Sequence, residues 1–230
     1  MDVVEAMWSR KSIRAFKPEP VAKKVLQEIL EAACRAPSAL NTQPWEFFVI
    51  GGDALKELCE ENVKHLKAGA PLELEVAESA FPRDSVYRKR QVELAKQLFR
   101  AMGIAREDEE KRTEWTQRGF RHFDAPAAIV IVQDESLSGS GPLMDIGSVM
   151  QSICLAAVKY GLGTCIARQG VYYPDVLRKI AGIPESKKIV IAIAIGTPDW
   201  DFPANAVDTD PVSYTHLRAH ETSSMIAYAV

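Results

Sequence analysis

The sequence has few cysteines, and they form no pattern. Cys34, Cys59, Cys154 and Cys165 stand far apart, without a Cys-x-x-Cys spacing, in apolar runs typical of helices or strands. Disulfide frameworks and cysteine zinc sites need several cysteines at short, regular spacing. We therefore expect buried, reduced thiols and no metal site built on cysteine.

Long apolar segments and an excess of positive charge are also missing. No stretch approaches the ~18 consecutive apolar residues of a membrane-spanning helix. The first residues, Met1 to Trp8, carry acids instead of the basic and then apolar pattern of a signal peptide. The net charge is −3, whereas a protein that binds a phosphate backbone needs a broad basic face. We predict a cytoplasmic protein that binds neither nucleic acid nor a membrane.

Complete nucleotide-binding and metal-binding motifs are absent as well. The Gly-x-Gly within Tyr160–Gly163 follows a helical pattern instead of a strand and lacks the third glycine of a dinucleotide fingerprint, so we interpret it as a chain reversal. No glycine-rich loop ending in Lys-Ser or Lys-Thr occurs, which argues against an NTPase. His216 and His220 are four residues apart beside Glu221, but no third ligand is evident, and we predict no metal site.

What the sequence does have is the composition of one folded domain. Its 230 residues are 47% hydrophobic and 26% charged, which is enough for a sizeable core. Helical spacing of apolar residues predicts helices over residues 3–10, 21–33, 53–66, 92–102, 106–120, 143–158 and 174–181. Short apolar runs predict strands over residues 46–50, 127–132, 164–167 and 189–195, the last of them central in the sheet. This order lacks a strict βαβ rhythm and favours an α+β layered domain.

The segment Arg10-Lys11-Ser12-Ile13-Arg14 places three cations and a hydroxyl within five residues. A phosphate monoester carries about −1.5 to −2 charges at neutral pH, and arginine matches its oxygens with a two-pronged donor. Taken alone, the segment is still better interpreted as a solvated basic turn after the first helix.

A second polar segment, Pro37 to Gln43, follows the second predicted helix. Ser38, Asn41 and Gln43 offer donors and acceptors on a loop bounded by two prolines, as needed to bind the amide-like edge of a planar heterocycle. The alternative is a helix cap and turn.

Together these segments resemble the FMN-dependent nitroreductase family. The resemblance is carried by Arg10–Arg14, by Ala36-Pro37-Ser38-Ala39-Leu40-Asn41-Thr42-Gln43-Pro44-Trp45, by Asp145-Ile146-Gly147, by Tyr160–Thr164, by Gly182-Ile183-Pro184 and by Gly196-Thr197-Pro198. These segments are weak one by one and specific in combination, and they cover about residues 1–205.

The resemblance implies a three-layer α+β fold with a central, mostly antiparallel sheet flanked by helices. It implies a homodimer that holds FMN at the subunit interface, and ping-pong reduction by NADH or NADPH. Nitroaromatics, quinones and activated alkenes are the implied acceptors. A flavin-binding protein without turnover, and a family member with other flavin chemistry such as reductive dehalogenation, stay open as alternatives.

The resemblance also implies roles for particular residues. Arg10, Ser12 and Arg14 would hold the phosphate and ribityl chain, with Arg14 near the flavin pyrimidine and Lys11 acting through its backbone or charge. The partner chain would supply Pro37, Ser38, Ala39 and Asn41. Gln169 and Gly170 would lie beside the reactive flavin edge, although many relatives carry an acid where this chain has Gln169. No side chain is expected to be catalytic, because the flavin carries the chemistry.

We expect one nitroreductase-like, FMN-binding domain over residues 1–210. Two regions stand out: an excursion within this domain and a tail after it. Residues 67–123 are expected to form an excursion over the site, whose aromatics Trp115, Phe120 and Phe123 either cover the acceptor pocket or belong to the core. Residues 211–230 change in character, and Pro211 stands where relatives carry a phosphate-directed arginine. We interpret this tail as a foreign or out-of-frame extension.

Overall fold

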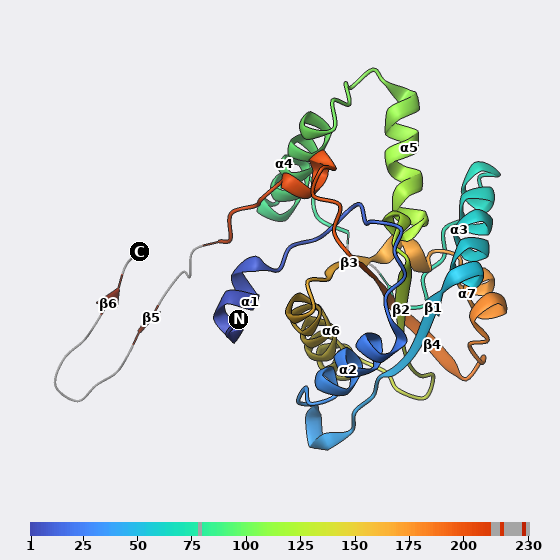
Figure 1. Ribbon diagram of the computed structural model, residues 1–230, viewed down its shortest axis with the longest axis vertical. Coiled ribbons are helices and arrows are strands. Elements are labelled where there is room, and N and C mark those ends of the chain that lie inside the picture. The colour runs from blue at the N-terminus through green and yellow to red at the C-terminus, as the bar shows by residue number, and fades with distance from the viewer. Residues whose placement is uncertain (78–79, 213–216, 219–226, 229–230) are drawn as a thin grey trace.

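The computed structural model describes residues 1–77, 80–212, 217–218 and 227–228 (Figure 1). His216, His220 and Glu221 lie outside the described residues, as does most of the segment after Pro211. The helices are α1 (Val3–Ser9), α2 (Lys23–Ala33), α3 (Gly52–Lys67), α4 (Val86–Ala101), α5 (Glu109–Phe120), α6 (Gly141–Lys159) and α7 (Pro174–Ala181). The strands are β1 (Glu46–Gly51), β2 (Ala127–Asp134), β3 (Gly163–Ala167), β4 (Lys187–Gly196), β5 (Leu217–Arg218) and β6 (Ala227–Tyr228).

The first four strands form one sheet in the order β1-β2-β4-β3, and all three pairings are antiparallel. Strand β4 lies inside the sheet between β2 and β3, as its uniformly apolar sequence predicts. The chain after α1 joins the free edge of β3, where Ser12 bridges Thr164 in parallel. The predicted antiparallel α+β sheet is therefore confirmed.

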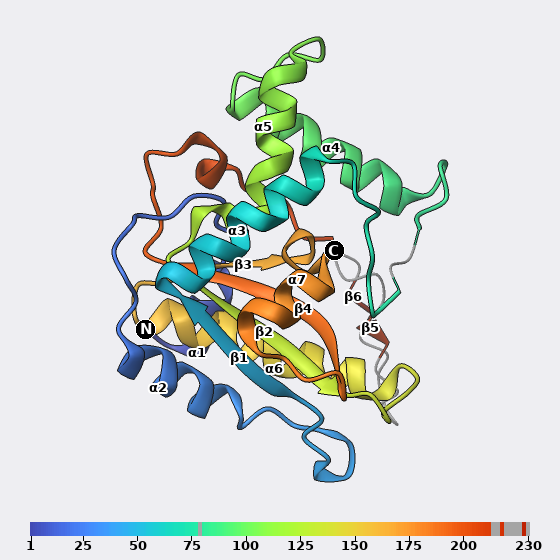
Figure 2. The same cartoon turned by 90° about the vertical axis from the view of Figure 1, so that its right-hand side faces the viewer.

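Helices cover both faces of the sheet, which gives three layers. Alternate residues of a strand point to opposite faces, so Ile129 and Ile131 of β2 pack with α2 and α6, whereas Ala128 and Val130 pack with α3 and α7. Figure 1 shows the sheet edge-on between the two helical layers, and Figure 2 shows α3 and α7 in front of it. The predicted three-layer arrangement is confirmed.

Helix boundaries follow the caps, and two predictions need correction. Helix α3 begins at Gly52 instead of the predicted residue 53, where we expected Asp53 to be the N-cap; Gly51 is the N-cap, and Asp53 lies in the first turn. Helix α4 begins at Val86, six residues before the predicted Val92, because the Ser85 hydroxyl accepts the N–H of Arg88. The first turns of α4 are exposed and show no apolar periodicity, so the spacing of apolar residues did not predict them.

Helices α4 and α5 extend beyond the sheet layers, at the upper end of Figure 1. The C-terminal end of α5 returns to the core, where Phe120 is 2% exposed and packs against Tyr172 and Tyr173. Phe120 is therefore a core residue, whereas Phe123 is partly buried against a small cluster around Ile13. Trp115 makes an edge contact with Phe99 of α4.

Helix α6 is long and apolar enough to cross a membrane by length and composition alone. One side of it packs on the sheet through Ile146, Val149 and Ile153, which are all buried. In the single chain 28% of its apolar 18-residue window is buried.

Candidate functional site

The basic segment lies in an extended stretch directly after α1. The helix ends at Ser9, and Arg10 adopts extended backbone angles. Ile13 is 2% exposed, and its N–H donates to the carbonyl of Thr164 at 2.9 Å. In an extended chain neighbouring side chains point to opposite sides. The buried Ile13 therefore directs Ser12 and Arg14 away from the core.

A cavity of about 480 Å³ lies against this segment. Arg10, Lys11, Ser12 and Arg14 line it together with Trp8, Leu94 of α4 and residues 207–209. The structure thus brings four of the predicted site residues together.

The charge of this cavity fits a phosphate monoester. Lys11 forms an ion pair with Asp208 at 2.8 Å, and Asp208 is largely exposed. One carboxylate against the cations of Arg10, Lys11 and Arg14 leaves two positive charges uncompensated. A phosphate monoester carries about −1.5 to −2 charges, so these residues suit the phosphate end of FMN.

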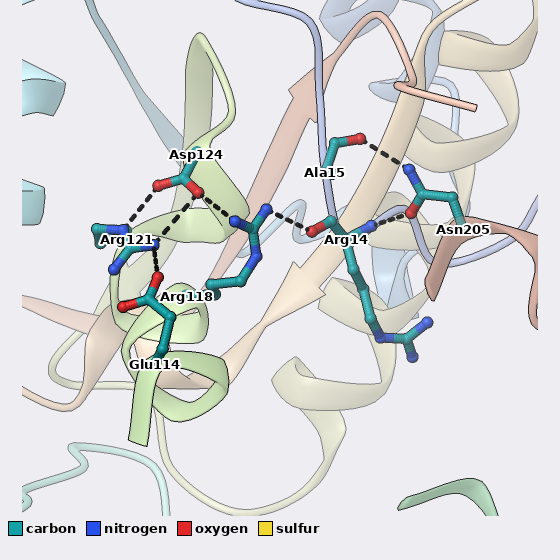
Figure 3. Close-up of polar contacts among 7 residues, drawn as sticks. All are labelled: Arg14, Ala15, Glu114, Arg118, Arg121, Asp124 and Asn205. Carbon is teal, nitrogen blue, oxygen red and sulfur yellow. Dashed lines mark hydrogen bonds and ion pairs between the residues drawn. The ribbon is translucent and has the colours of Figure 1, made fainter. Parts of the chain in front are cut away.

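The backbone of Arg14 is fixed by side chains from distant parts of the chain (Figure 3). Its N–H donates to the Asn205 Oδ1 at 2.6 Å, and its carbonyl accepts the Arg118 Nη2 at 3.1 Å. Its own Nη1 donates to the carbonyl of Ser12 at 3.1 Å. Burial lowers the pKa of Arg14, but a guanidinium stays charged at any working pH.

Gln169 and Gly170 lie in the short helical turn η3 (Arg168–Val171) after β3. A Cβ on Gly170 would lie 2.2 Å from Cε1 of His122, and a Cβ on Gly119 would lie 1.7 Å from Oε1 of Gln169. Gly170 leaves no room for a side chain, because its backbone lies against the His122 ring, whereas at Gly119 the near atoms are the end of the flexible Gln169 side chain. The Gln169 side chain points toward α5.

His122 is fully buried behind Gly170. Neither of its ring nitrogens has a hydrogen-bond partner among the described residues. Burial lowers the pKa of His122 to about 4, so the ring is neutral near pH 7. Together with Phe123 and Asp124 it adopts positive φ angles, a strained backbone for residues other than glycine.

The loop of residues 37–43 is also strained and internally bonded. Leu40, Asn41 and Gln43 all have positive φ angles. The Ser38 hydroxyl accepts the N–H of Gln43 at 3.0 Å, and the Gln43 side chain donates to that of Asn41 at 3.0 Å. Such backbone angles persist where the surrounding structure holds them, as these side-chain bonds do here.

A contact with α6 holds this loop away from the basic segment. The N–H of Ala39 donates to both carboxylate oxygens of Asp145, near the start of α6, at 3.1 and 3.2 Å. Figures 1 and 2 show the loop at the lower end of the molecule, whereas the segment after α1 lies higher, beside β3. Pro37, Ser38, Ala39 and Asn41 therefore do not join Arg10–Arg14 within one chain.

A larger groove of about 770 Å³ contains none of the predicted residues. It lies along α3 and is lined by Lys56, Cys59, Lys64, Arg121 and Asp124, among others. Burial raises the pKa of Cys59 to about 12, which keeps this thiol protonated near pH 7. Among the residues whose placement is described, no group of three His, Cys, Asp or Glu side chains could hold a metal ion.

Sequence reasoning missed Asn205, Arg118, Asp208 and His122. Arg118 is 104 residues from its contact at Arg14, and Asn205 is 191 residues away. A local sequence pattern cannot indicate contacts between residues so far apart in the chain. Pro211, at the place of a phosphate-directed arginine in relatives, was the only indication that this part of the chain lies at the site.

Comparison with solved structures defines the class of protein. The crystal structure of the FMN and NADPH-dependent nitroreductase NfnB from "sphigopyxis sp. strain HMH" superimposes with a TM-score of 0.87 at 27% identity, over 93% of this chain and 96% of that one. The FMN-dependent nitroreductase NfnB from Mycobacterium smegmatis, solved in complex with NADPH, gives 0.84 at 25% identity, over 92% and 96%. The fold is that of the nitroreductase-type oxidoreductases.

Sequence comparison then gives the family. The Nitroreductase family model matches residues 8–197. The nitrobenzene nitroreductase of Ectopseudomonas oleovorans is 33% identical over 198 residues, which are 85% of this chain and 86% of that protein. The chain belongs to the nitroreductase family, and the predicted family and enzyme class are confirmed.

Proposed function

We propose that this chain is an FMN-dependent oxidoreductase that takes hydride from NADH or NADPH and passes it to an electron-poor acceptor. The observation that carries the proposal is the cationic cavity formed by Arg10, Lys11, Ser12 and Arg14 in a chain of the nitroreductase family. Relatives named for nitrobenzene and chloronitrobenzene support nitroaromatics as the first acceptors to test. Quinones and activated alkenes are further candidates.

Each predicted residue has a physical role in this proposal. Arg10, Lys11 and Ser12 would bind the phosphate, with the charge of Lys11 shared with Asp208. Arg14 would lie toward the pyrimidine ring and stabilise the negative charge that the ring gains on reduction. Because Pro211 replaces the arginine of relatives, Arg10 and Arg14 would carry a larger share of the binding.

The bound FMN supplies the hydride chemistry between the nicotinamide and the acceptor. The chain itself orients the reactants and excludes water. At the reactive edge Gly170 would let its backbone N–H approach the flavin ring, and the buried, neutral His122 ring packs directly behind Gly170. The nicotinamide and the acceptor would occupy the same space in turn, as a ping-pong cycle requires.

We propose that the complete site needs two chains. In the partner, Pro37, Ser38, Ala39 and Asn41 would contribute the loop that lies far from Arg10–Arg14 in its own chain. Exposed apolar side chains support an interface: Leu40 in this loop is 99% exposed, and Val3, Val4, Met7 and Trp8 of α1 are each more than half exposed. Large exposed apolar patches mark interaction surfaces.

Residues 67–123 would act as a cover that selects the acceptor, since Leu94 of α4 lines the cavity and Arg118 of α5 contacts Arg14. The foreign origin of residues 211–230 and the cytoplasmic location stay predictions. Sequencing the coding region again tests the former, and an intact native reading frame would contradict it.

Comparison of FMN with riboflavin tests the phosphate site. The apoprotein should bind FMN more tightly by a factor of about 10 or more, since a charge-assisted contact contributes about 1.5–3 kcal/mol. Equal affinity for the two flavins would remove the cavity from the proposal. Acceptors are then screened by following flavin reoxidation.

A further inference from the structure

Side chains hold the backbone of Arg14, between a backbone bond from the Ile13 N–H to the Thr164 carbonyl and one from the Asp199 N–H to the Ala15 carbonyl at 3.1 Å. The Arg14 N–H donates to Oδ1 of Asn205 at 2.6 Å, and the Ala15 carbonyl accepts Nδ2 of Asn205 at 2.9 Å. The Arg14 carbonyl accepts Nη2 of Arg118 at 3.1 Å. Figure 3 shows the two side chains on either side of this short stretch of backbone, with the Arg14 side chain extending away from both.

Both holding side chains are themselves fixed. Asn205 is fully buried, and its Nδ2 also donates to the carbonyl of Asp199 at 2.7 Å. The Arg118 side chain is 16% exposed, forms an ion pair with Asp124 at 2.9 Å and lies 4.5 Å above the ring of Phe202. A side chain held at several points loses little further entropy when it makes one more contact. The two residues therefore form a rigid holder.

Asn205 and Arg118 hold the backbone of Arg14, whose guanidinium has no carboxylate partner among the described residues. Within the described part of the chain Arg14 forms no ion pair, and it lines the cavity next to Ser12. An arginine side chain samples many rotamers, so a fixed backbone reduces the space that its guanidinium samples. The cation is thereby prepared for an anionic or electron-rich ligand before the ligand arrives.

We propose that Asn205 and Arg118 are positioning residues for Arg14, which set the place of its guanidinium at the flavin. This inference rests on the proposed function, in which Arg14 contacts FMN. It also connects α5, within the 67–123 excursion, to the flavin site. A purely structural role for the two residues would lower the stability of the fold without changing the flavin selectively.

Arg118→Met tests the proposal, with Arg121→Met as matched control. Both variants remove one positive charge at or just after the C-terminal end of α5 and one ion pair with Asp124, and Arg121→Met also removes the ion pair with Glu114. Only Arg118 contacts residue 14. Apoprotein is titrated with FMN, and the midpoint potential of the bound flavin is measured. We expect Arg118→Met to weaken FMN binding about tenfold and to make the potential more negative, whereas Arg121→Met stays within about twofold.

Two further variants separate positioning from folding. Arg118→Lys keeps a donor and a charge and should restore most of the affinity and the potential. In an Arg14→Met background, Arg118→Met should have no additional effect on either quantity, because its target is gone. If Arg118→Met does not fold, Arg118→Gln is compared with Arg121→Gln in the same way. Asn205→Ala, checked for folding by its melting temperature, should reproduce the effects of Arg118→Met.

The outcomes are distinguishable. Equal effects of the Arg118 and Arg121 variants, or an effect of Arg118→Met that persists without Arg14, would overturn the inference and leave the proposed function intact. If Arg14→Met itself changes neither the affinity for FMN nor the potential, the role of Arg14 in the proposed function fails, and the inference fails with it.

Discussion

Arg10 is the residue whose replacement should most simply weaken the phosphate site. It lines the cavity beside Lys11 and Ser12. Arg10→Ala should reduce the affinity for FMN by about 1.5–3 kcal/mol, the typical contribution of a hydrogen bond to a charged group. Fluorescence titration of the apoprotein measures this. Lys17→Ala removes an exposed cation outside the cavity and should bind FMN as the wild type does. Unchanged affinity in Arg10→Ala would exclude Arg10 from the site.

His122 should make stability depend on pH. Its pKa is about 4 in the folded protein, because of burial, against about 6.5 when unfolded. Between these values only the unfolded chain takes up the proton, so acid favours unfolding. The free energy of unfolding should fall by about 2 kcal/mol from pH 7 to pH 5 on account of this residue.

Urea unfolding at the two pH values tests this with two variants. His122→Asn has no titrating ring and tolerates the positive φ angle, so its stability should change less between pH 7 and pH 5. His65→Asn, at a partly exposed histidine, should retain the wild-type dependence. The same dependence in all three proteins would contradict the burial of a neutral His122.

At the scale of elements, the loop between α3 and α4 is fastened to the sheet through one carboxylate. Glu75 accepts the Arg178 Nη2 and the backbone N–H of Ile189 in β4, both at 2.5 Å. Arg178 is 9% exposed and also donates to the carbonyls of Pro184 and Lys187. Glu75 thereby connects the start of the excursion to α7 and to the core.

Glu75→Gln should lower the free energy of unfolding by about 3 kcal/mol, because it leaves the buried Arg178 with only the exposed carboxylate of Glu185, 3.7 Å away, as counter-charge. Glu73→Gln, at an exposed position two residues earlier, should change it by less than about 0.5 kcal/mol. Denaturant unfolding of both variants measures the difference. An equal loss of unfolding free energy in both variants would show that the contacts of Glu75 with Arg178 and Ile189 do not stabilise the fold.

At the scale of the whole molecule, the sequence predicted the layers better than the site. Periodicity and apolar runs located the sheet strands, because burial dictates residue type directly, as in the uniformly apolar β4. The start of α4 was missed because an exposed helix needs no apolar pattern. The contacts of Asn205 and Arg118 with Arg14 depend on tertiary packing, which local sequence does not encode.

The assembly itself can be tested through Leu40. This side chain is 99% exposed in the single chain, so Leu40→Asp should not alter the stability of a monomer. In a dimer whose partner packs against the loop, it should weaken both association and FMN binding. Sedimentation of the flavin-loaded protein measures this, with Leu72→Asp at another exposed loop position as control. A flavin-loaded wild-type monomer would contradict the two-chain site.

The central claim, that this chain is an FMN-dependent reductase, is tested most directly by the two half-reactions in the absence of oxygen. The purified protein, loaded with FMN, is mixed with NADPH or NADH, and its flavin absorbance is followed. After the nicotinamide is removed, nitrobenzene is added. We predict that the yellow colour bleaches with the nicotinamide and returns with the acceptor. An FMN-loaded protein that stays oxidised with both nicotinamides would contradict the account.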